Sequence, residues 1–490
     1  MTSDTATIRP TLFCLHALGM SRLEYGPVTE SLGDDFDVVA LDLPGFGDES
    51  TVDGVTVDDM VRQVTRSIRR HGATRWMLVG HSMGGKIASI VAARTLAGQG
   101  GLFGLAGVVL LAASPPSPEP MDEQNRAQMI AAAADGPLDA DTARSFVDDN
   151  VGAPLPTVLD DQALADLHRT SPEAWTAWFE RGSREDWSAE VGTLDLPALI
   201  VAGGADGPLG DDAQRRLNGA VYPRAAHRTL DGAGHLLPLE RPTELAEAIV
   251  AFWRDDASRA PVVPADFARV IASSRTASNT RGILARRAVA DDPRYRPRVL
   301  TEAQLATLRA VAARVVPQDD PDHAIDLAAR VDAQLAAGYG DGWRNVDLPS
   351  DPEAYALGLD ALAGFADLSA EQQDDRLAAI VAGDPDLSLQ TTGDSGGGRS
   401  HHGDEPEDGA DAPDAPSTEE AHPFTVAQLT VWFEDCRVDL VKLWLAHPAT
   451  MERIGFDGFA NGRAGRALQG FGRLGAGQRE GWEPAMEVTR

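Results

Sequence analysis

A serine in a glycine-rich turn is the first residue whose setting points to chemistry. The segment GHSMGG, residues 80–85, begins at the end of the apolar run WMLVG and precedes the helical pattern KIASIVAARTL, so Ser82 is expected where a strand turns sharply into a helix. Glycines suit both sides of such a turn, because the serine backbone is strained and the strand and helix approach too closely for side chains. The pattern predicts a serine nucleophile. A chain this rich in glycine produces it by chance with a probability of roughly 0.2 to 0.3, so its context must decide.

A carboxylate and an imidazole follow the serine in the order that this kind of site requires. Asp206, in VAGGADG, comes just after a later apolar run, and His235, in DGAGHLLPLERP, lies in a loop before the next helical pattern. His235 would take the proton of Ser82 while Asp206 orients the imidazole. Asp211 and Asp212 are rivals for the acid, but they are better placed to cap the helical stretch DDAQRRL. The predicted catalytic residues are therefore Ser82, Asp206 and His235.

A further turn can supply the groups that stabilise a negatively charged oxygen. HALG, residues 16–19, follows the apolar run TLFCL, and the backbone N–H of Leu18 is expected to form an oxyanion hole together with the N–H of Met83. We interpret His16 as holding this loop rather than as a base. His81, between a glycine and the serine, is interpreted as a packing residue of the turn.

The elements that must position these residues alternate from Thr11 to about Ala257. Short apolar runs are separated by longer amphipathic stretches, and the runs are TLFCLH, FDVVALD, WMLVG, GVVLLAA and PALIVAG. Runs that are apolar throughout are typical of strands buried on both faces, which predicts an α/β fold with a parallel sheet covered by helices. Residues 115–194 contain helical patterns instead, and predict a helical cap inserted into the sheet. Trp175 and Trp178 in this cap are interpreted as packing residues, with a place at the substrate entrance as the alternative.

With these motifs in this order, residues 8–257 resemble the α/β-hydrolase superfamily, in its small esterase and haloperoxidase-like branch. The resemblance implies an α/β-hydrolase fold with a mostly parallel sheet. Because the segment before the first strand is too short for the two leading antiparallel strands of the full family sheet, we expect about six strands. Relatives that dehalogenate or open epoxides carry an aspartate at the position of Ser82, so the serine argues against those reactions. The expected reaction is cleavage of a carboxylic ester or lactone by acyl transfer.

The second half of the chain has a different pattern. Residues 258–298 are arginine-rich and irregular and predict a linker, which would leave residues 1–257 as the first domain. Residues 299–490 show apolar stripes at helical spacing and no strand-like run, so they predict a separate all-α domain. Within it, residues 384–422 hold eleven acidic residues against one arginine and predict a disordered acidic insert. His401 and His402, in this insert, are expected to bind metal only weakly.

This second half carries a resemblance of its own. The stretches that carry it are LTEAQLATLRAVAARVVPQDDP, IDLAARVDAQLAAGYGDGWR, LPSDPEAYALGLDALAGF and WFEDCRVDLVKLWLAHPATMERIGFDG. They resemble subunit 3, the small subunit of gluconate 2-dehydrogenase-type flavoprotein complexes. In that family the small subunit holds no cofactor and accompanies a separate FAD-containing dehydrogenase, so the resemblance implies an FAD-dependent oxidoreductase as partner. The secretion signal common in the family is absent and the acidic insert is unusual, and a helical domain with some other partner remains the alternative.

Composition limits the remaining partners. The 490 residues carry 75 acidic and 43 basic side chains, a formal net charge of −32, and this field repels phosphate backbones and anionic membranes. Cys14 and Cys436 are the only cysteines and lie in unlike contexts, so no disulfide framework or cysteine zinc site is expected. Without a signal segment or an apolar run of about 18 residues, we expect a cytoplasmic protein. No cofactor, metal, nucleic acid or membrane is expected at the site, whose substrate would be a small ester or lactone.

Two functions from different classes follow from these observations. The first is a serine hydrolase fused to a helical domain that docks an FAD-dependent dehydrogenase. The alternative is a non-catalytic accessory or assembly subunit of a flavoprotein dehydrogenase complex, which uses the hydrolase fold as a scaffold.

Overall fold

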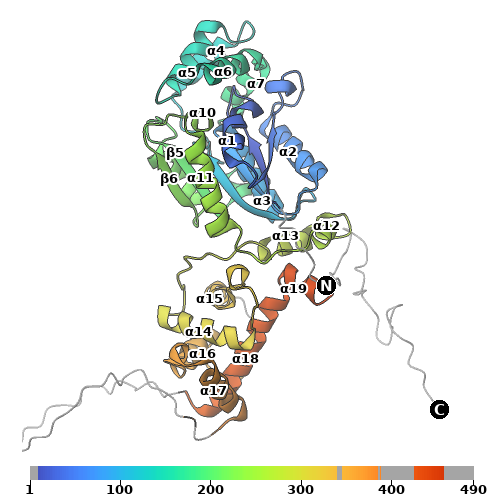
Figure 1. The fold of residues 1–490 in the computed structure, drawn as a ribbon, viewed down its shortest axis with the longest axis vertical. Helices are drawn as coiled ribbons and strands as arrows, with labels where there is room; N and C mark the ends of the chain where they lie inside the picture. Colours follow the sequence, from blue (N-terminus) through green and yellow to red (C-terminus); the bar gives the residue numbers. More distant parts are fainter. Residues whose placement is uncertain (1–8, 339–344, 385–386, 388–423, 457–490) are drawn as a thin grey trace, which may run out of the picture. The chain divides into compact units, whose positions relative to one another are not determined.

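The chain forms two compact units (Figure 1). The structure, a computed structural model, describes residues 9–338, 345–384, 387 and 424–456. The first unit comprises Met1–Pro293 with His447–Arg490, and the second comprises Arg294–Ala446. The predicted acidic insert, 384–422, with its histidine pair, lies outside the described residues except for residues 384 and 387.

A six-stranded sheet is the centre of the first unit. Its order is β2-β1-β3-β4-β5-β6, and every neighbouring pair of strands is parallel. The strands are β1 (Thr11–Leu15), β2 (Asp37–Leu41), β3 (Trp76–His81), β4 (Leu105–Leu111), β5 (Ala198–Gly203) and β6 (Ala226–Leu230). The predicted α/β fold and the expected number of strands are confirmed. β6, with the sequence AHRTL, was not among the predicted runs, because as an edge strand it is only partly buried and only partly apolar.

Side chains alternate between the two faces of this sheet, and helices cover both faces. Phe13 and its like-facing neighbours pack against α2 (Val57–His71) and α3 (Met83–Leu96). Leu12 and the residues that share its face pack against α1 (Gly26–Leu32) and α11 (Pro242–Phe252), which lie side by side (Figure 1). Because successive strand residues point to opposite faces, a strand covered on both sides must be apolar at every position.

The helical cap lies between β4 and β5, as predicted. Its elements are α4 (Glu123–Ala132), α5 (Ala140–Asp149), α6 (Thr157–Arg169), α7 (Pro172–Ala177), the π-helical turn η3 (Trp178–Gly182) and α8 (Ser188–Val191). Trp175 is fully buried and its ring contacts those of Phe146 and Phe179 at centroid distances of 5.2 Å, so packing is its role.

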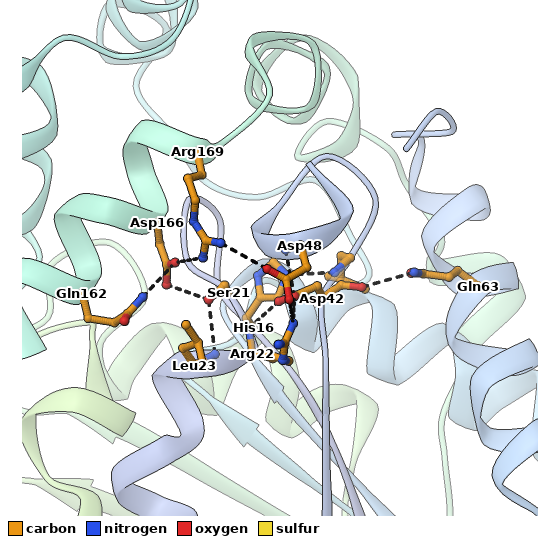
Figure 2. Close-up of polar contacts among 11 residues, drawn as sticks. His16, Ser21, Arg22, Leu23, Asp42, Asp48, Gln63, Gln162, Asp166 and Arg169 are labelled. Atoms are coloured by element: carbon orange, nitrogen blue, oxygen red, sulfur yellow. Dashed lines mark hydrogen bonds and ion pairs between the residues drawn. The ribbon is translucent and has the colours of Figure 1, made fainter. Parts of the chain in front are cut away.

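Polar contacts tie the cap to the loop after β1 (Figure 2). Asp166 of α6 is buried and accepts hydrogen bonds from the hydroxyl of Ser21 at 2.7 Å and from Arg169 at 2.6 Å. Arg169 also reaches Asp48, in the loop after β2, at 3.2 Å. Ser21 in turn caps the short helix η1 (Arg22–Tyr25) through the N–H of Leu23. The cap is therefore fixed to the same loop that carries the predicted oxyanion residue.

The stretch 258–298 differs from the linker expected there. It contains α12 (Ala265–Ala272) and α13 (Ser278–Arg287), whose apolar side chains join the core of the first unit. Arg281 is buried and donates hydrogen bonds to the carbonyls of Gly98 at 2.7 Å and Ile271 at 2.9 Å. Arginine normally marks an exposed position, so an arginine that satisfies buried carbonyls gives no periodic signal in the sequence.

The second unit contains helices and no strand among its described residues, so the predicted all-α region is confirmed. Its main helices are α14 (Glu302–Val315), α15 (Leu327–Ala337), α16 (Asp351–Asp360), α17 (Ala370–Ala382) and α18 (Val426–Leu445). Leu305, Leu359 and Trp432 are in its core. Helix α19 (Pro448–Arg453) groups with the first unit instead, because Met451 packs into that unit's core.

Candidate active site

Ser82 lies between the end of β3 and the start of α3, in a strained conformation. Its φ is 49° and its ψ is −117°, and among the described residues only Ala112 shares a positive φ without being glycine. Such a backbone persists only where its surroundings hold it in place. The N–H of Ser82 donates to the carbonyl of Leu111 at 2.9 Å, and its own carbonyl accepts from the N–H groups of Gly85 and Ser114 at 2.8 and 2.9 Å.

The neighbouring glycines allow this turn. A Cβ on Gly80 would lie 2.6 Å from the carbonyl oxygen of Gly84, and a Cβ on Gly84 would overlap the carbonyl of Leu15. The close approach of strand and helix that was expected from the sequence is therefore present, and larger residues at these positions would push α3 away from the sheet.

His235 and Asp206 come from the ends of two neighbouring strands. Asp206 follows β5, and His235 lies between β6 and the short helix α10 (Leu237–Glu240). The Nδ1 of His235 lies 2.8 Å from Oδ2 of Asp206, and the two side chains are only 13% and 5% exposed. Asp211, the rival acid, instead pairs with Arg215 at 2.8 Å and with the hydroxyl of Thr229 at 2.7 Å. Asp211 and Asp212 lie in the first turn of α9 (Asp211–Val221) and not at its cap, which is Gly210.

The pair determines how His235 carries its protons. Burial lowers the pKa of His235, but the hydrogen bond and charge of Asp206 outweigh burial, so this pKa lies above its usual value. Because a carboxylate only accepts, Nδ1 carries a proton toward Asp206. In the neutral ring Nε2 is then the atom free to act as a base.

A cavity of about 550 Å³ brings these residues together. Ser82, His235, Asp206 and Leu18 all contribute to its wall. Much of the apolar part of the wall comes from the cap, and the larger apolar residues include Met121, Met129, Phe146, Trp178, Phe179, Leu209 and Leu236. Trp178 therefore lines the cavity as well as packing in the cap. Among the described residues that form this wall, no lysine or arginine occurs, whereas Glu119, Asp122 and Asp149 do.

The two predicted oxyanion residues come from the loop after β1 and from the start of α3. Leu18 is on the cavity wall, and Met83 is the first residue of α3. In the part of the chain that the structure describes, neither N–H donates to another protein group. His16 holds the loop before Leu18, since its Nδ1 lies 2.7 Å from the carbonyl of Ala17 and its Nε2 accepts from the N–H of Leu43 at 3.0 Å. One ring nitrogen donates and the other accepts, so His16 is neutral, and burial lowers its pKa accordingly.

Two glutamates near the site were not identified from the sequence. Glu119, on the cavity wall, accepts a hydrogen bond from Ser114 at 2.6 Å, and burial raises its pKa. Glu24, of η1, is buried and contacts His81. Both lie in short segments without periodicity, and their positions follow from contacts with distant parts of the chain, so no local pattern could have found them.

Comparisons with known proteins agree with this architecture. Residues 12–248 match the family model described as the alpha/beta hydrolase family. This half of the chain is therefore an alpha/beta hydrolase domain, of the same superfamily as esterases and other hydrolases.

Among curated proteins, the chain is 27% identical over 266 residues to the biotin biosynthesis bifunctional protein BioHC of Teredinibacter turnerae, a match that covers 51% of this chain and 46% of that protein. It is 36% identical over 107 residues to the 2-succinyl-6-hydroxy-2,4-cyclohexadiene-1-carboxylate synthase of Serratia proteamaculans. This match covers 22% of this chain and 40% of that protein. The chain thus spans less than half the length of either relative.

Among solved structures, an esterase from Exiguobacterium antarcticum is 16% identical, with a TM-score of 0.45, covering 50% of this chain and 91% of that one. Within the described residues, no helix is both long and apolar enough to span a bilayer. The same residues hold no group of three or more histidine, cysteine or carboxylate side chains arranged to bind a metal ion.

Proposed function

We propose that this protein is a serine hydrolase that cleaves a carboxylic ester or lactone by acyl transfer. The observation that carries the proposal is the strained Ser82 on the wall of a cavity that it shares with the hydrogen-bonded pair of His235 and Asp206. In this mechanism His235 takes the proton of Ser82 as its Oγ attacks the carbonyl carbon, and the N–H groups of Leu18 and Met83 stabilise the oxyanion. His235 then protonates the leaving alcohol, and water releases the acid from the acyl-enzyme by the same steps.

A fluorophosphonate probe and a short-chain aryl ester test this proposal on the full chain. The probe should label Ser82, and Ser82→Ala should abolish labelling and lower kcat by roughly 10⁴- to 10⁶-fold with an unchanged circular dichroism spectrum. Ser31→Ala, at an exposed serine of α1, is the matched control and should retain both labelling by the probe and the wild-type kcat. Wild-type turnover in a folded Ser82→Ala variant would exclude the mechanism.

The charge of the cavity supports an uncharged or cationic substrate. Carboxylates line it, and its described wall residues include no lysine or arginine, although the charges of Lys86 and Arg126, which are not wall residues, act on Glu119. The Serratia proteamaculans relative, by contrast, is named for a succinyl-bearing carboxylate. A butyrate aryl ester should therefore have a kcat/KM at least about tenfold above that of the matching hemisuccinate, since a nearby like charge costs a few kcal/mol. Glu119→Gln should narrow this ratio, and a preference for the hemisuccinate would contradict the assignment.

The helical unit is proposed to dock an FAD-dependent oxidoreductase, as its resemblance implies. An apolar stripe on α18 supports a docking role, because Val438, Val441 and Leu445 are 49%, 37% and 37% exposed at helical spacing. The partner would supply the ester, since dehydrogenation of a cyclic hemiacetal gives a lactone that Ser82 can open.

Affinity purification with the full chain tests the docking. The captured protein should contain FAD and dehydrogenase activity, and Val438→Asp should abolish capture, whereas Val381→Asp, exposed on α17, should not. Capture of a flavoprotein by a chain whose Ser82 cannot be labelled would favour the alternative function, a non-catalytic accessory subunit.

A further inference from the structure

His81 and Glu24 form a buried contact directly behind the candidate active site. Their side chains are 0% and 1% exposed. The Nδ1 of His81 lies 3.1 Å from both carboxylate oxygens of Glu24, and its Nε2 lies 2.8 Å from the backbone carbonyl oxygen of His235. His81 was interpreted from the sequence as a packing residue only, and the structure differs because both of its ring nitrogens have polar partners.

These partners determine the protonation of His81. A backbone carbonyl accepts hydrogen bonds, so Nε2 donates to His235; an ionised Glu24 also accepts, and opposite an ionised Glu24 both ring nitrogens of His81 donate and carry protons. His81 is then an imidazolium, and Glu24 balances its charge. His16 provides the contrast, because one of its ring nitrogens accepts from a backbone N–H and its ring is neutral.

The other titratable groups near Glu24 do not replace His81 as its counter-charge. Cys14 and Tyr25 lie close to Glu24, and burial raises the pKa of both, so they stay protonated and uncharged. His16 is neutral, and His235 has its own carboxylate in Asp206. His81 is thus the group that both contacts Glu24 and can carry the balancing charge.

We infer that Glu24 and His81 act as a positioning ion pair that joins the three segments of the candidate active site. Glu24 accepts the N–H of Ala17 at 3.3 Å, directly before the oxyanion residue Leu18. His81 directly precedes Ser82 in the chain, and its Nε2 donates a hydrogen bond to the backbone carbonyl of His235. A single buried pair therefore touches the oxyanion loop, the nucleophile turn and the histidine loop. The inference rests on the proposed function, because the pair is assigned to positioning of that catalytic geometry.

The protonation of His81 can be measured without any activity. In full-length protein labelled with ¹⁵N-histidine, the ion pair requires that His81 shows two protonated ring nitrogens. His227, half-buried on β6, has a pKa that burial lowers, so it should gain its second proton only as the pH is decreased, and His16 should show one protonated nitrogen. Glu24→Gln should remove the second proton of His81. A neutral His81 in the wild-type protein would overturn the ion pair.

Kinetics test whether the pair positions the site. Glu24→Gln and His81→Gln should each lower kcat by about 10²-fold with little change in KM, because a displacement of about 1 Å costs that much. The double variant, which buries two neutral amides and no unpaired charge, should lose no more than either single variant. Glu30→Gln, on the exposed side of α1, is the matched control and should retain wild-type kcat.

The outcomes separate this inference from the proposed function. Additive losses, a change confined to KM, or wild-type kcat in the folded variants would overturn the positioning role, while Ser82-dependent hydrolysis in the wild-type protein would leave the hydrolase assignment intact. Hydrolysis that does not depend on Ser82 would remove both, and the spectra would still decide whether the ion pair exists.

Discussion

Each unit of the molecule buries an aspartate, and the two are used differently. Asp206, at the strand ends of the first unit, is 5% exposed and its carboxylate has one hydrogen-bond partner among the described residues, the ring of His235. Asp332, in the helical unit, is fully buried. It accepts four hydrogen bonds, from the hydroxyl of Tyr295 at 2.6 Å and from the N–H groups of Arg298, Val299 and Leu300 at 2.6, 3.1 and 2.8 Å.

The difference shows what distinguishes a candidate functional carboxylate from a structural one. Burial is common to both, so burial alone does not identify a site. Asp332 is saturated by donors that hold one turn of backbone, whereas Asp206 is bonded to a single titratable ring that borders a cavity. A buried carboxylate with an unfilled bonding capacity beside a cavity is the more informative observation.

The largest effect is expected for Asp206→Asn. An amide at this position holds the wrong tautomer of His235, so kcat should fall by about 10⁴-fold while the free energy of unfolding changes little. Asp211→Asn is the matched control, because Asp211 pairs with Arg215 at the surface. Ester hydrolysis and urea unfolding measure the two quantities. A silent Asp206→Asn together with an inactive Asp211→Asn would assign the acid to Asp211.

Asp332→Asn should have the opposite effect. Replacing the carboxylate removes charge-assisted hydrogen bonds to three backbone N–H groups, so the helical unit should lose about 2 to 4 kcal/mol of its free energy of unfolding while kcat is unchanged. Hydrogen exchange of the amides of residues 298–300 is the direct measurement, and Asp367→Asn, at an exposed aspartate, is the control.

The pH dependence of this loss has a definite sign. Burial raises the pKa of Asp332, but its hydrogen bonds lower this pKa by more than burial raises it, so the folded-state pKa lies below the usual value. The stabilisation is therefore present above the unfolded-state pKa of about 3.9 and is lost as the pH falls through the folded-state pKa. The difference between wild type and variant should shrink below about pH 4, and a difference that grows there would contradict the account.

A smaller effect tests whether residues 258–298 belong with the first unit. Gly98 and Gly72 have nearly the same φ, 76° and 77°. A Cβ on Gly98 would overlap Ser278 and lie 2.5 Å from the backbone nitrogen of Gly282, and both of these residues belong to α13. A Cβ on Gly72 would have no atom within 4 Å. Gly72→Ala should lower the free energy of unfolding by about 1 kcal/mol through backbone strain alone. Gly98→Ala should cost about 1 to 3 kcal/mol more. Equal losses in urea unfolding would mean that α13 does not pack there.

The sequence predicts most of what is local and little of what is distant. The buried strands and the turn at Ser82 follow from runs of apolar residues and from glycine spacing, which depend on neighbours in the chain. β6 is missed because an edge strand needs only part of the apolar signal. Glu24 is missed because its role depends on His81, 57 positions away, and such pairings are decided by the folded topology.

The smallest effect concerns the pH profile and joins the two aspartates in one experiment. In the proposed mechanism neutral His235 is the base, and Asp206 raises its pKa above the usual value of about 6.5. On that mechanism kcat/KM for an uncharged ester should fall as the pH decreases through a midpoint above 6.5. In Asp206→Asn the raising effect of the carboxylate is lost while burial still lowers the pKa, so the residual activity should have its midpoint at a lower pH than in wild type. Asp332→Asn should leave the midpoint where it is, because that carboxylate is bonded to backbone and to Tyr295. A wild-type midpoint at or below 6.5, or one that Asp206→Asn does not move, would show that the Asp206 carboxylate does not tune His235.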